Sequence, residues 1–268
     1  MLKGLTDYTY AMSLKDAWET RLAHPRSLFL SGGVGIGIRK ESATERIIDL
    51  RKALNSNYEE TKHGIRIGAG ISINEWLEQS DDPLVIEALR KVGTNQIRNM
   101  ATIGGSIAQH FSWSDVCTLL LAIDGEVTVF SGASTQIKID AYWGKKDPGI
   151  IEQVWIPRWH THGQYFKFAQ TGYDISYLNM AIAARIENGQ ILKIGIAVGA
   201  RPGSAMRMSK LERFLEQNAP YAAIAEQTEQ ITGIASEFPL SSNHDASADY
   251  RRTLVITSIQ RFLERLQP

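Results

Sequence analysis

The stretch Gln96-Ile97-Arg98-Asn99-Met100-Ala101-Thr102-Ile103-Gly104-Gly105-Ser106 places two adjacent glycines near the middle of the chain. Glycine carries no Cβ, so a glycine pair lets the backbone approach another backbone or a ligand very closely. An apolar segment, predicted to be a helix from about Ser114 to Ile123, follows. We interpret Thr102 to Ser106 as a glycine loop with a packing or binding role.

An earlier glycine-rich run, Ser31-Gly32-Gly33-Val34-Gly35-Ile36-Gly37, follows a short strand predicted for Ser27 to Leu30. Successive exposed N–H groups form anion-binding nests, although a plain glycine-rich turn has the same pattern. The run lacks the G-x-G-x-x-G spacing of a Rossmann site, and Arg39 to Thr44 does not read as the helix that should follow. Two such loops in one chain suit a diphosphate held from two sides, which favours a large nucleotide cofactor.

Composition excludes several classes of protein. The 268 residues include 29 basic and 29 acidic side chains and one cysteine. A neutral chain has no cationic surplus for nucleic acid, and one thiol cannot hold an iron–sulfur cluster. No apolar run approaches the roughly 20 residues of a membrane span, and no signal peptide precedes the first helix pattern. We therefore expect a cytoplasmic protein with no nucleic-acid partner and no membrane span.

The periodicity predicts an α+β fold. Capped helices and short strands alternate up to about residue 163, and a smaller sheet covered by helices follows. In this second part Asn188-Gly189 is a strong hairpin signal between two alternating segments. The other predicted elements are helices at Ser13–Leu22, Ser72–Leu77, Asp82-Pro83 onward, Ser209–Leu215 and Tyr250–Leu266, and strands at Ile47–Leu50, Ile65–Ile67, Val127–Phe130, Ser176–Ile186 and Leu192–Val198.

The string from Arg98 to Gly105, with Ser114-Asp115 downstream, resembles the FAD-binding (medium) subunit of molybdenum hydroxylases, the family of xanthine dehydrogenase and carbon monoxide dehydrogenase. Ser31-Gly32-Gly33 stands where that family has its first pyrophosphate loop. Tyr165-x-Lys167-Phe168, Asp174-Ile175 and Tyr250-Arg251-Arg252 follow in the family's order. The resemblance covers essentially the whole chain. It implies a two-subdomain FAD-binding fold of the vanillyl-alcohol-oxidase type in residues 1–163 (about 1–55 and 56–163). A C-terminal α/β domain with a small antiparallel sheet and helices would occupy residues 164–268.

The resemblance also implies a noncovalent FAD site. Asp115 would bond ribityl or ribose hydroxyls, and Val92, Ile151 and Lys167 would line the rest of the site. The alternative for Lys167 is a solvated lysine on an edge strand, and for Asp115 a residue that satisfies a helix N-terminus. The residues implied to hold the FAD diphosphate are Phe29, Leu30, Ser31, Gly32, Gly33, Val34, Gly35, Ile36, Thr102, Ile103, Gly104, Gly105 and Ser106.

Some positions depart from the family pattern. Val34-Gly35 replaces a threonine followed by an acidic residue or serine, and Ser106 replaces the commoner asparagine. Gln170-Thr171-Gly172 stands where arginines are frequent, and Trp113 where proline is common. These changes concern the surroundings of the flavin and the strength of FAD binding rather than the fold.

Two other features are simpler to explain. His160-Thr161-His162 fits a loop between two strands better than half of a metal site, because no third ligand is spaced to complete one. We therefore expect no metal in this chain. Cys117 lies in an apolar helix pattern and should be a buried small hydrophobe.

By resemblance, the chain is an electron-transfer subunit without a catalytic residue of its own. Its partners would be a large molybdopterin subunit and a small subunit with two [2Fe–2S] clusters. The resemblance also implies a dimer of such heterotrimers. Electrons would pass from molybdenum through the clusters to FAD, and then to NAD, oxygen or another acceptor. Two alternatives stay open: a structural or assembly module with weak or lost FAD, and a standalone flavin oxidoreductase.

Overall fold

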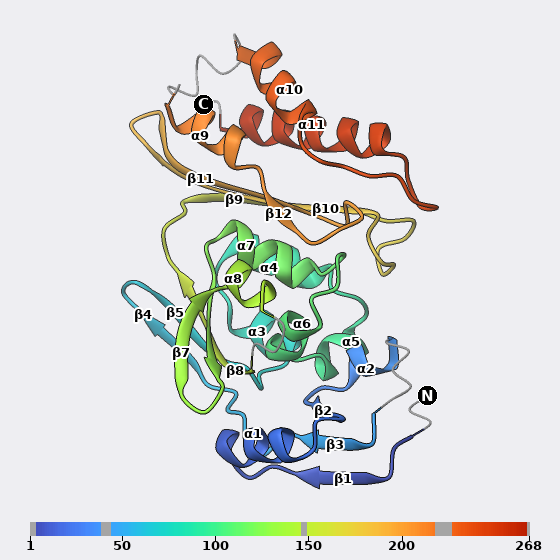
Figure 1. Ribbon diagram of the computed structural model, residues 1–268. Coiled ribbons are helices and arrows are strands. Elements are labelled where there is room, and N and C mark those ends of the chain that lie inside the picture. Colours follow the sequence, from blue (N-terminus) through green and yellow to red (C-terminus); the bar gives the residue numbers. More distant parts are fainter. Residues whose placement is uncertain (1–3, 39–43, 146–148, 218–226, 267–268) are drawn as a thin grey trace. The chain divides into compact units, whose positions relative to one another are not determined.

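The structure is a computed structural model that describes residues 4–38, 44–145, 149–217 and 227–266 (Figure 1). Most of the segment 39–44, which bears on the Rossmann comparison, lies outside these residues. The chain forms two compact units. Unit 1 comprises Met1–Ser80, Thr94–His110 and Gly125–Arg158, and unit 2 comprises Asp81–Gly93, Phe111–Asp124 and Trp159–Pro268. None of the described helices is both long and apolar enough to cross a bilayer.

Unit 1 begins with a small parallel sheet in the order β1-β3-β2, formed by β1 (Asp7–Tyr10), β2 (Ser27–Leu30) and β3 (Arg46–Asp49). Helix α1 (Leu14–Ala23) starts where predicted, because the Ser13 side chain accepts a hydrogen bond from the Asp16 N–H at 3.1 Å. A short helix, α2 (Val34–Ile38), follows the first glycines.

An antiparallel sheet forms the rest of unit 1, in the order β4-β5-β8-β6-β7. Its strands are β4 (Tyr58–Thr61), β5 (Gly64–Gly68), β6 (Glu126–Phe130), β7 (Ser134–Lys138) and β8 (Ile150–Pro157), and its helices are α3 (Ile73–Gln79), α5 (Asn95–Met100), α6 (Ile103–Gln109) and α8 (Ile139–Trp143). The capping box predicted at Ser72 is confirmed, since Ser72 and Glu75 exchange side-chain and backbone hydrogen bonds.

Unit 2 is built on a four-stranded antiparallel sheet in the order β12-β11-β10-β9. The strands are β9 (His162–Phe168), β10 (Leu178–Glu187), β11 (Gln190–Gly199) and β12 (Met206–Arg207). The predicted hairpin is confirmed: Asn188 and Gly189 both have positive φ, at 51° and 75°, as a type I′ turn requires. The α+β class is confirmed in both units.

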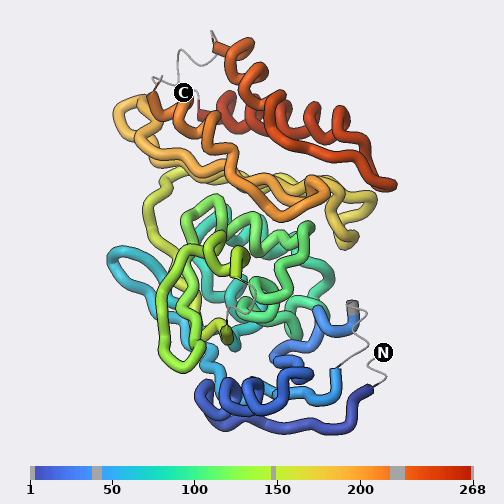
Figure 2. Tube along the Cα trace, in the orientation of Figure 1, coloured from blue at the N-terminus to red at the C-terminus, as the bar shows by residue number. Residues whose placement is uncertain are grey.

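Helices cover both faces of this sheet (Figures 1 and 2). On one face α9 (Ser209–Gln217), α10 (Thr228–Ser236) and α11 (Ala248–Arg265) enclose an apolar core. The other face packs on α4 (Pro83–Arg90) and α7 (Asp115–Ala122), which come from the middle of the chain. Because both faces are covered, residues 178–184 of β10 are all buried.

Small residues let α7 approach the sheet. A Cβ added at Gly195 would lie 2.0 Å from the Ala122 carbonyl oxygen. A Cβ at Gly199 would lie 2.3 Å from both the Thr118 hydroxyl and the Asn179 side-chain oxygen. These two glycines of β11 therefore set the spacing between α7 and the sheet.

Arg251 fixes the start of α11. Its side chain is fully buried and donates to the carbonyl oxygens of Tyr177, Ser241 and Ala246, and to Oδ1 of Asn243. Burial lowers the pKa of this guanidinium. The arginine thus ties the helix to the loop before it and to Tyr177, the residue that precedes β10.

Candidate functional site

The first glycine run and the Thr102–Ser106 stretch lie against each other in unit 1. A Cβ added at Gly32 would lie only 1.8 Å from the Met100 carbonyl oxygen, so no larger residue fits there. Gly33 has φ +78°, and a Cβ at Gly35 would meet the Gln109 side chain at 2.5 Å. The two glycine segments predicted to act together are therefore brought together.

The first segment presents backbone donors. Val34 starts helix α2, and the first N–H groups of a helix have no acceptor within the helix. Within the described ranges no protein group accepts a hydrogen bond from the N–H of Gly32, Gly33 or Val34, all of which are half-buried. This part of unit 1 can bind an anion through its backbone.

The second segment is the first turn of helix α6 rather than a loop. Thr102 caps the helix by accepting from the Gly105 N–H at 3.2 Å. The Gly104 N–H donates to the Ala69 carbonyl at 3.0 Å, and a Cβ at Gly104 would lie 2.8 Å from that of Ala69. These N–H groups bind within the protein, in contrast to our expectation that they would be donors to a diphosphate.

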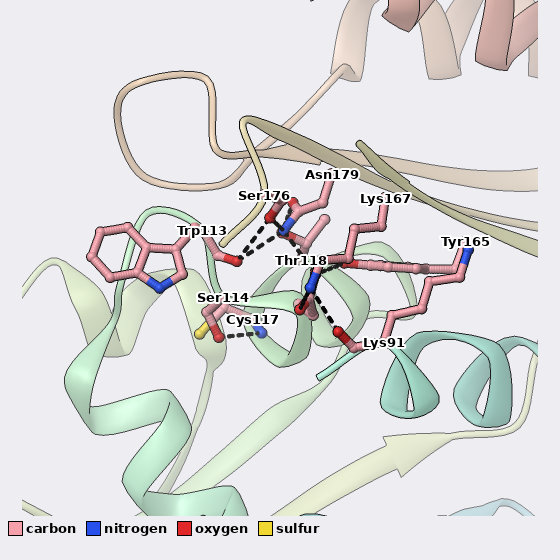
Figure 3. A network of polar contacts seen from close by, with 10 residues as sticks. Lys91, Trp113, Ser114, Cys117, Thr118, Tyr165, Lys167, Ser176 and Asn179 are labelled. Carbon is pink, nitrogen blue, oxygen red and sulfur yellow. Dashed lines mark hydrogen bonds and ion pairs between the residues drawn. The ribbon is translucent and has the colours of Figure 1, made fainter. Parts of the chain in front are cut away.

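A buried polar network in unit 2 includes Lys167, Tyr165 and Asn179 (Figure 3). All three donate hydrogen bonds to Asp115. Its Oδ1 accepts from the Tyr165 hydroxyl at 2.6 Å and from Asn179 Nδ2 at 3.2 Å. Its Oδ2 accepts from Lys167 Nζ at 3.1 Å, and the same ammonium donates to the Lys91 carbonyl at 2.6 Å. Two predicted site residues, Asp115 and Lys167, thus form an ion pair.

Strand register explains how these groups meet. Tyr165 and Lys167 are two residues apart on β9, so they share one face of the sheet. Asn179 pairs directly with Lys167 across the β9–β10 ladder. Thr118 donates to Asn179 Oδ1 at 2.8 Å, and Asn179 Nδ2 also reaches the Trp113 carbonyl at 3.0 Å. The Asn179 amide is therefore held in one orientation.

Burial controls the electrostatics of the pair. The Asp115 and Lys167 side chains are 8% and 6% exposed. Burial raises the pKa of Asp115, while the Lys167 ammonium and the two neutral donors oppose that rise. Burial and the Asp115 carboxylate together raise the pKa of Tyr165 well above its usual value. Lys167 does lie on edge strand β9, but the solvated lysine of the alternative interpretation is wrong.

The remaining predicted residues occupy different places. Val92 follows helix α4, half-buried in unit 2, and Ile151 is buried in strand β8 of unit 1. Cys117 is fully buried as predicted, and burial raises the pKa of its thiol to about 12. His160 pairs with Asp82 at 2.9 Å.

Three residues of the network, Tyr165, Asn179 and Thr118, have no role predicted from the sequence. Tyr165 belongs to the family pattern Tyr165-x-Lys167-Phe168. Its spacing of two residues from Lys167 predicts that both side chains lie on one face of a strand. Asn179 is an amide within an otherwise apolar strand, which is a usable signal for a satisfied polar cluster. Thr118 sits in the apolar helix α7 and carried no signal at all.

Comparison with known proteins identifies the chain. Residues 4–159 match the family described as "FAD binding domain in molybdopterin dehydrogenase", and residues 164–266 match "CO dehydrogenase flavoprotein C-terminal domain". The chain belongs to this family. It is an FAD-binding subunit of the molybdenum hydroxylase type, as the resemblance predicted.

Some relatives match this chain over nearly their whole length. In others the matching region is a small part of a longer protein. The nicotine 6-hydroxylase medium subunit of Paenarthrobacter nicotinovorans is 27% identical, covering 95% of this chain and 94% of its own length. Probable aldehyde oxidase 1 of Oryza sativa subsp. japonica is 31% identical over 77% of this chain, which matches only 17% of that protein. Reconstituted CO dehydrogenase from Oligotropha carboxidovorans superposes with a TM-score of 0.89 at 19% identity, covering 99% of both chains. This likeness confirms the fold.

The residues present fit FAD in each unit taken by itself. In unit 1 the free N–H groups of Gly32, Gly33 and Val34 suit a diphosphate, and the glycine segments carry no carboxylate. In unit 2 Asp115 uses three of about four acceptor positions, which leaves one for a hydroxyl donor.

Proposed function

We propose that this flavin-binding chain is the electron-transfer subunit of a molybdenum hydroxylase complex. The observation that carries the proposal is the cradle of unused N–H groups at Gly32, Gly33 and Val34, packed against the N-terminus of α6. Such a cradle binds a diphosphate without cationic side chains, which agrees with the neutral composition.

The proposed FAD site keeps the residues implied by the sequence, with altered roles for some. The first glycine segment would supply N–H donors, whereas Gly104 and Gly105 would shape the cradle by close packing. Asp115 would accept from a hydroxyl of the ribityl chain or ribose, and Lys167 would hold that carboxylate in place. The full proposed set is Phe29, Leu30, Ser31, Gly32, Gly33, Val34, Gly35, Ile36, Val92, Thr102, Ile103, Gly104, Gly105, Ser106, Asp115, Ile151 and Lys167. In sequence terms the FAD-binding domain would be residues 1–163 and the C-terminal domain 164–268.

When bound, FAD would accept electrons from a partner's [2Fe–2S] clusters and donate them to NAD or another acceptor. The chain's own residues bind and orient the cofactor. The Lys167 ammonium offsets the negative charge of Asp115, so the cluster adds no net charge beside a reduced cofactor.

The partners follow from the same proposal. One relative is named a medium subunit, and the rice relative is much longer than this chain. We propose a large molybdopterin subunit and a small [2Fe–2S] subunit as partners, since the single buried Cys117 cannot ligate a cluster. A dimer of heterotrimers and a cytoplasmic location stay predictions.

Reconstitution tests the cofactor. The purified full chain should bind one FAD per chain, measured as flavin absorbance against protein after removal of excess cofactor. Absence of retained flavin would contradict the proposal. Molybdenum and iron analysis of the complex purified on this chain then tests the partners, and reoxidation of the reduced flavin by NAD or oxygen identifies the acceptor.

The alternative of a structural module with weak FAD has one observation in its favour. The N–H groups of Gly104 and Gly105 are bonded within the protein, and Val34 and Gly35 lack side chains that could bind the cofactor. A reducible flavin retained through gel filtration would exclude this alternative. The standalone oxidoreductase predicts substrate turnover by the isolated chain, and steady-state assays without partners test it.

A further inference from the structure

A pocket of about 420 Å³ lies along the free edge of the unit 2 sheet, at strand β9. Residues of β9, the C-terminal end of α4 and the C-terminal half of α11 form its walls. None of these residues except Lys167 belongs to the proposed flavin site. The lining residues are Glu87, Lys91, Gln164, Tyr165, Phe166, Lys167, Phe168, Arg261 and Arg265.

The pocket is strongly cationic. It has four cationic side chains and one carboxylate, that of Glu87. Lys167 is neutralised by Asp115, and Lys91 lies 3.6 Å from Glu87. Arg261 and Arg265 are exposed, and they make no ion pair or hydrogen bond with any residue that the structure describes. Two guanidinium groups without a carboxylate partner are suited to bind a phosphate or a carboxylate.

The two arginines, Arg261 and Arg265, add little to the stability of helix α11. Arg261 and Arg265 stand four residues apart, so their like charges repel one another on the same side of α11. Arg265, in the last turn, is favoured by the helix dipole, but Arg261 is one turn farther from that end. An anion between the two guanidinium groups would remove the repulsion.

A second observation, independent of charge, points to a ligand. The Gln164 side chain lines the pocket and is only 7% exposed. Its Oε1 is buried and has no hydrogen-bond partner. The two amide orientations of glutamine are equivalent in shape, so either an oxygen or a nitrogen of this amide lacks a partner. A buried unpaired polar atom is costly, and a ligand atom would satisfy it.

The edge of β9 favours a small molecule over an added strand. The Tyr165 N–H, which faces the free edge, already donates to Glu87 Oε2 at 2.9 Å. Glu87 therefore blocks one of the backbone positions that a docking strand would need. Phe168, half-buried at the end of the strand, offers an apolar surface beside the charged groups.

We propose that this pocket binds a small organic anion, a phosphate or carboxylate on a short apolar or aromatic body. Arg261 and Arg265 bind the anionic group, the Gln164 amide hydrogen-bonds to the ligand, and Phe168 packs on its body. The site stands on unit 2 alone and does not depend on the proposed flavin function.

Calorimetric titration of the FAD-saturated full chain tests the site with pyrophosphate, AMP and citrate as probes. Saturating FAD prevents AMP and pyrophosphate from reporting on the flavin site. At least one probe should bind with a one-to-one stoichiometry, and its affinity should fall as salt is raised. Arg261→Gln and Arg265→Gln should each weaken binding about tenfold or more, as for loss of a charge-assisted hydrogen bond. Arg213→Gln, an exposed arginine of α9 outside the pocket, is the matched control and should bind as the unmodified chain does.

Gln164→Met provides a second measurement. If the amide is there for a ligand, its apolar replacement should leave the melting temperature of the free chain unchanged or higher while binding weakens several-fold. The proposal is overturned if no probe binds saturably, or if the Arg261, Arg265 and Gln164 variants bind the probe like the Arg213 control. Flavin content measured on the same samples separates this outcome from failure of the flavin proposal.

Discussion

Lys167→Met would remove the cation beside a buried carboxylate while keeping most of the side-chain volume. Asp115 is 8% exposed, and it would keep only the neutral donors Tyr165 and Asn179. Breaking a buried pair by removing one partner costs about 3–5 kcal/mol. Because two donors remain, we expect the lower end of that range, about 3 kcal/mol.

Urea unfolding followed by circular dichroism and tryptophan fluorescence measures this loss. Lys210→Met is the matched control, because Lys210 pairs with Glu237 at 2.8 Å on the surface, where both side chains are exposed. We expect little measurable change in that control. The double variant Asp115→Asn/Lys167→Met should lose clearly less than the sum of the two single variants, since it leaves no unpaired charge.

The pH dependence gives the sign of the effect. Burial raises the pKa of Asp115 above its ordinary value of 3.8, so folding favours the protonated form. The buried carboxylate therefore lowers the free energy of unfolding only where it is charged. This loss is absent below the ordinary pKa and develops as pH rises through the folded-state pKa. Removing Lys167 raises the folded-state pKa further. The stability difference between Lys167→Met and the unmodified chain should therefore shrink as pH falls toward 4. A loss of less than about 1 kcal/mol, or one equal in acid and at neutral pH, would refute the reasoning.

Three further predictions rest on single residues. Gly32→Ala places a Cβ 1.8 Å from the Met100 carbonyl oxygen, so it should lower both the melting temperature and FAD retention. Gly37→Ala is the control, because a Cβ there would have no neighbour within 4 Å. It should leave FAD retention unchanged and the melting temperature unchanged or slightly higher. Cys117, whose thiol pKa is raised to about 12, should react with a thiol reagent only after denaturation, and rapid labelling of the native chain would contradict its burial. In Arg251→Lys the ammonium group cannot reach all four oxygens that the guanidinium binds. The free energy of unfolding in urea should therefore fall by about 2–4 kcal/mol. Full stability of this variant would show that those oxygens find other donors.

The features that could be predicted from sequence are those whose cause lies within a few residues. Ser13 and Ser72 cap their helices through the third residue after them, and Asn188-Gly189 closes a turn by its own φ angles. Each of these contacts joins residues at most three positions apart in the sequence. The predicted strands and helices built on them are accordingly present in the structure.

The second glycine segment, Thr102 to Ser106, begins a helix, whereas its sequence predicts a loop. Two glycines in a first turn lower helix propensity by about 1 kcal/mol each, so a loop was the natural interpretation. Tertiary packing decided otherwise: Gly104 fits closely against Ala69, and Thr102 caps the turn. The glycines are required by the approach of two backbones, and this requirement cannot be distinguished in sequence from binding of a ligand.

The Asp115 network was out of reach for a different reason. Tyr165, Lys167 and Asn179 contribute from positions 50 to 64 residues away in sequence, so no local pattern joins them to Asp115. The family resemblance supplied Asp115 and Lys167 singly. The β9–β10 register sets Asn179 opposite Lys167, and both side chains donate to Asp115. This register cannot be read from the separate motifs.

Glycine-rich motifs direct attention to the ligand, yet some of the tightest glycines lie elsewhere. A Cβ at Gly199 would press on the side-chain oxygens of both Thr118 and Asn179 at 2.3 Å, and those two groups fix the amide that donates to Asp115. Gly199 therefore supports the network although it stands at the end of an ordinary strand and belongs to no motif. The polar cluster fits between α7 and β11 because β11 has no side chain at Gly199. The geometry of the site therefore depends on the packing of the sheet as much as on the residues of the family motifs.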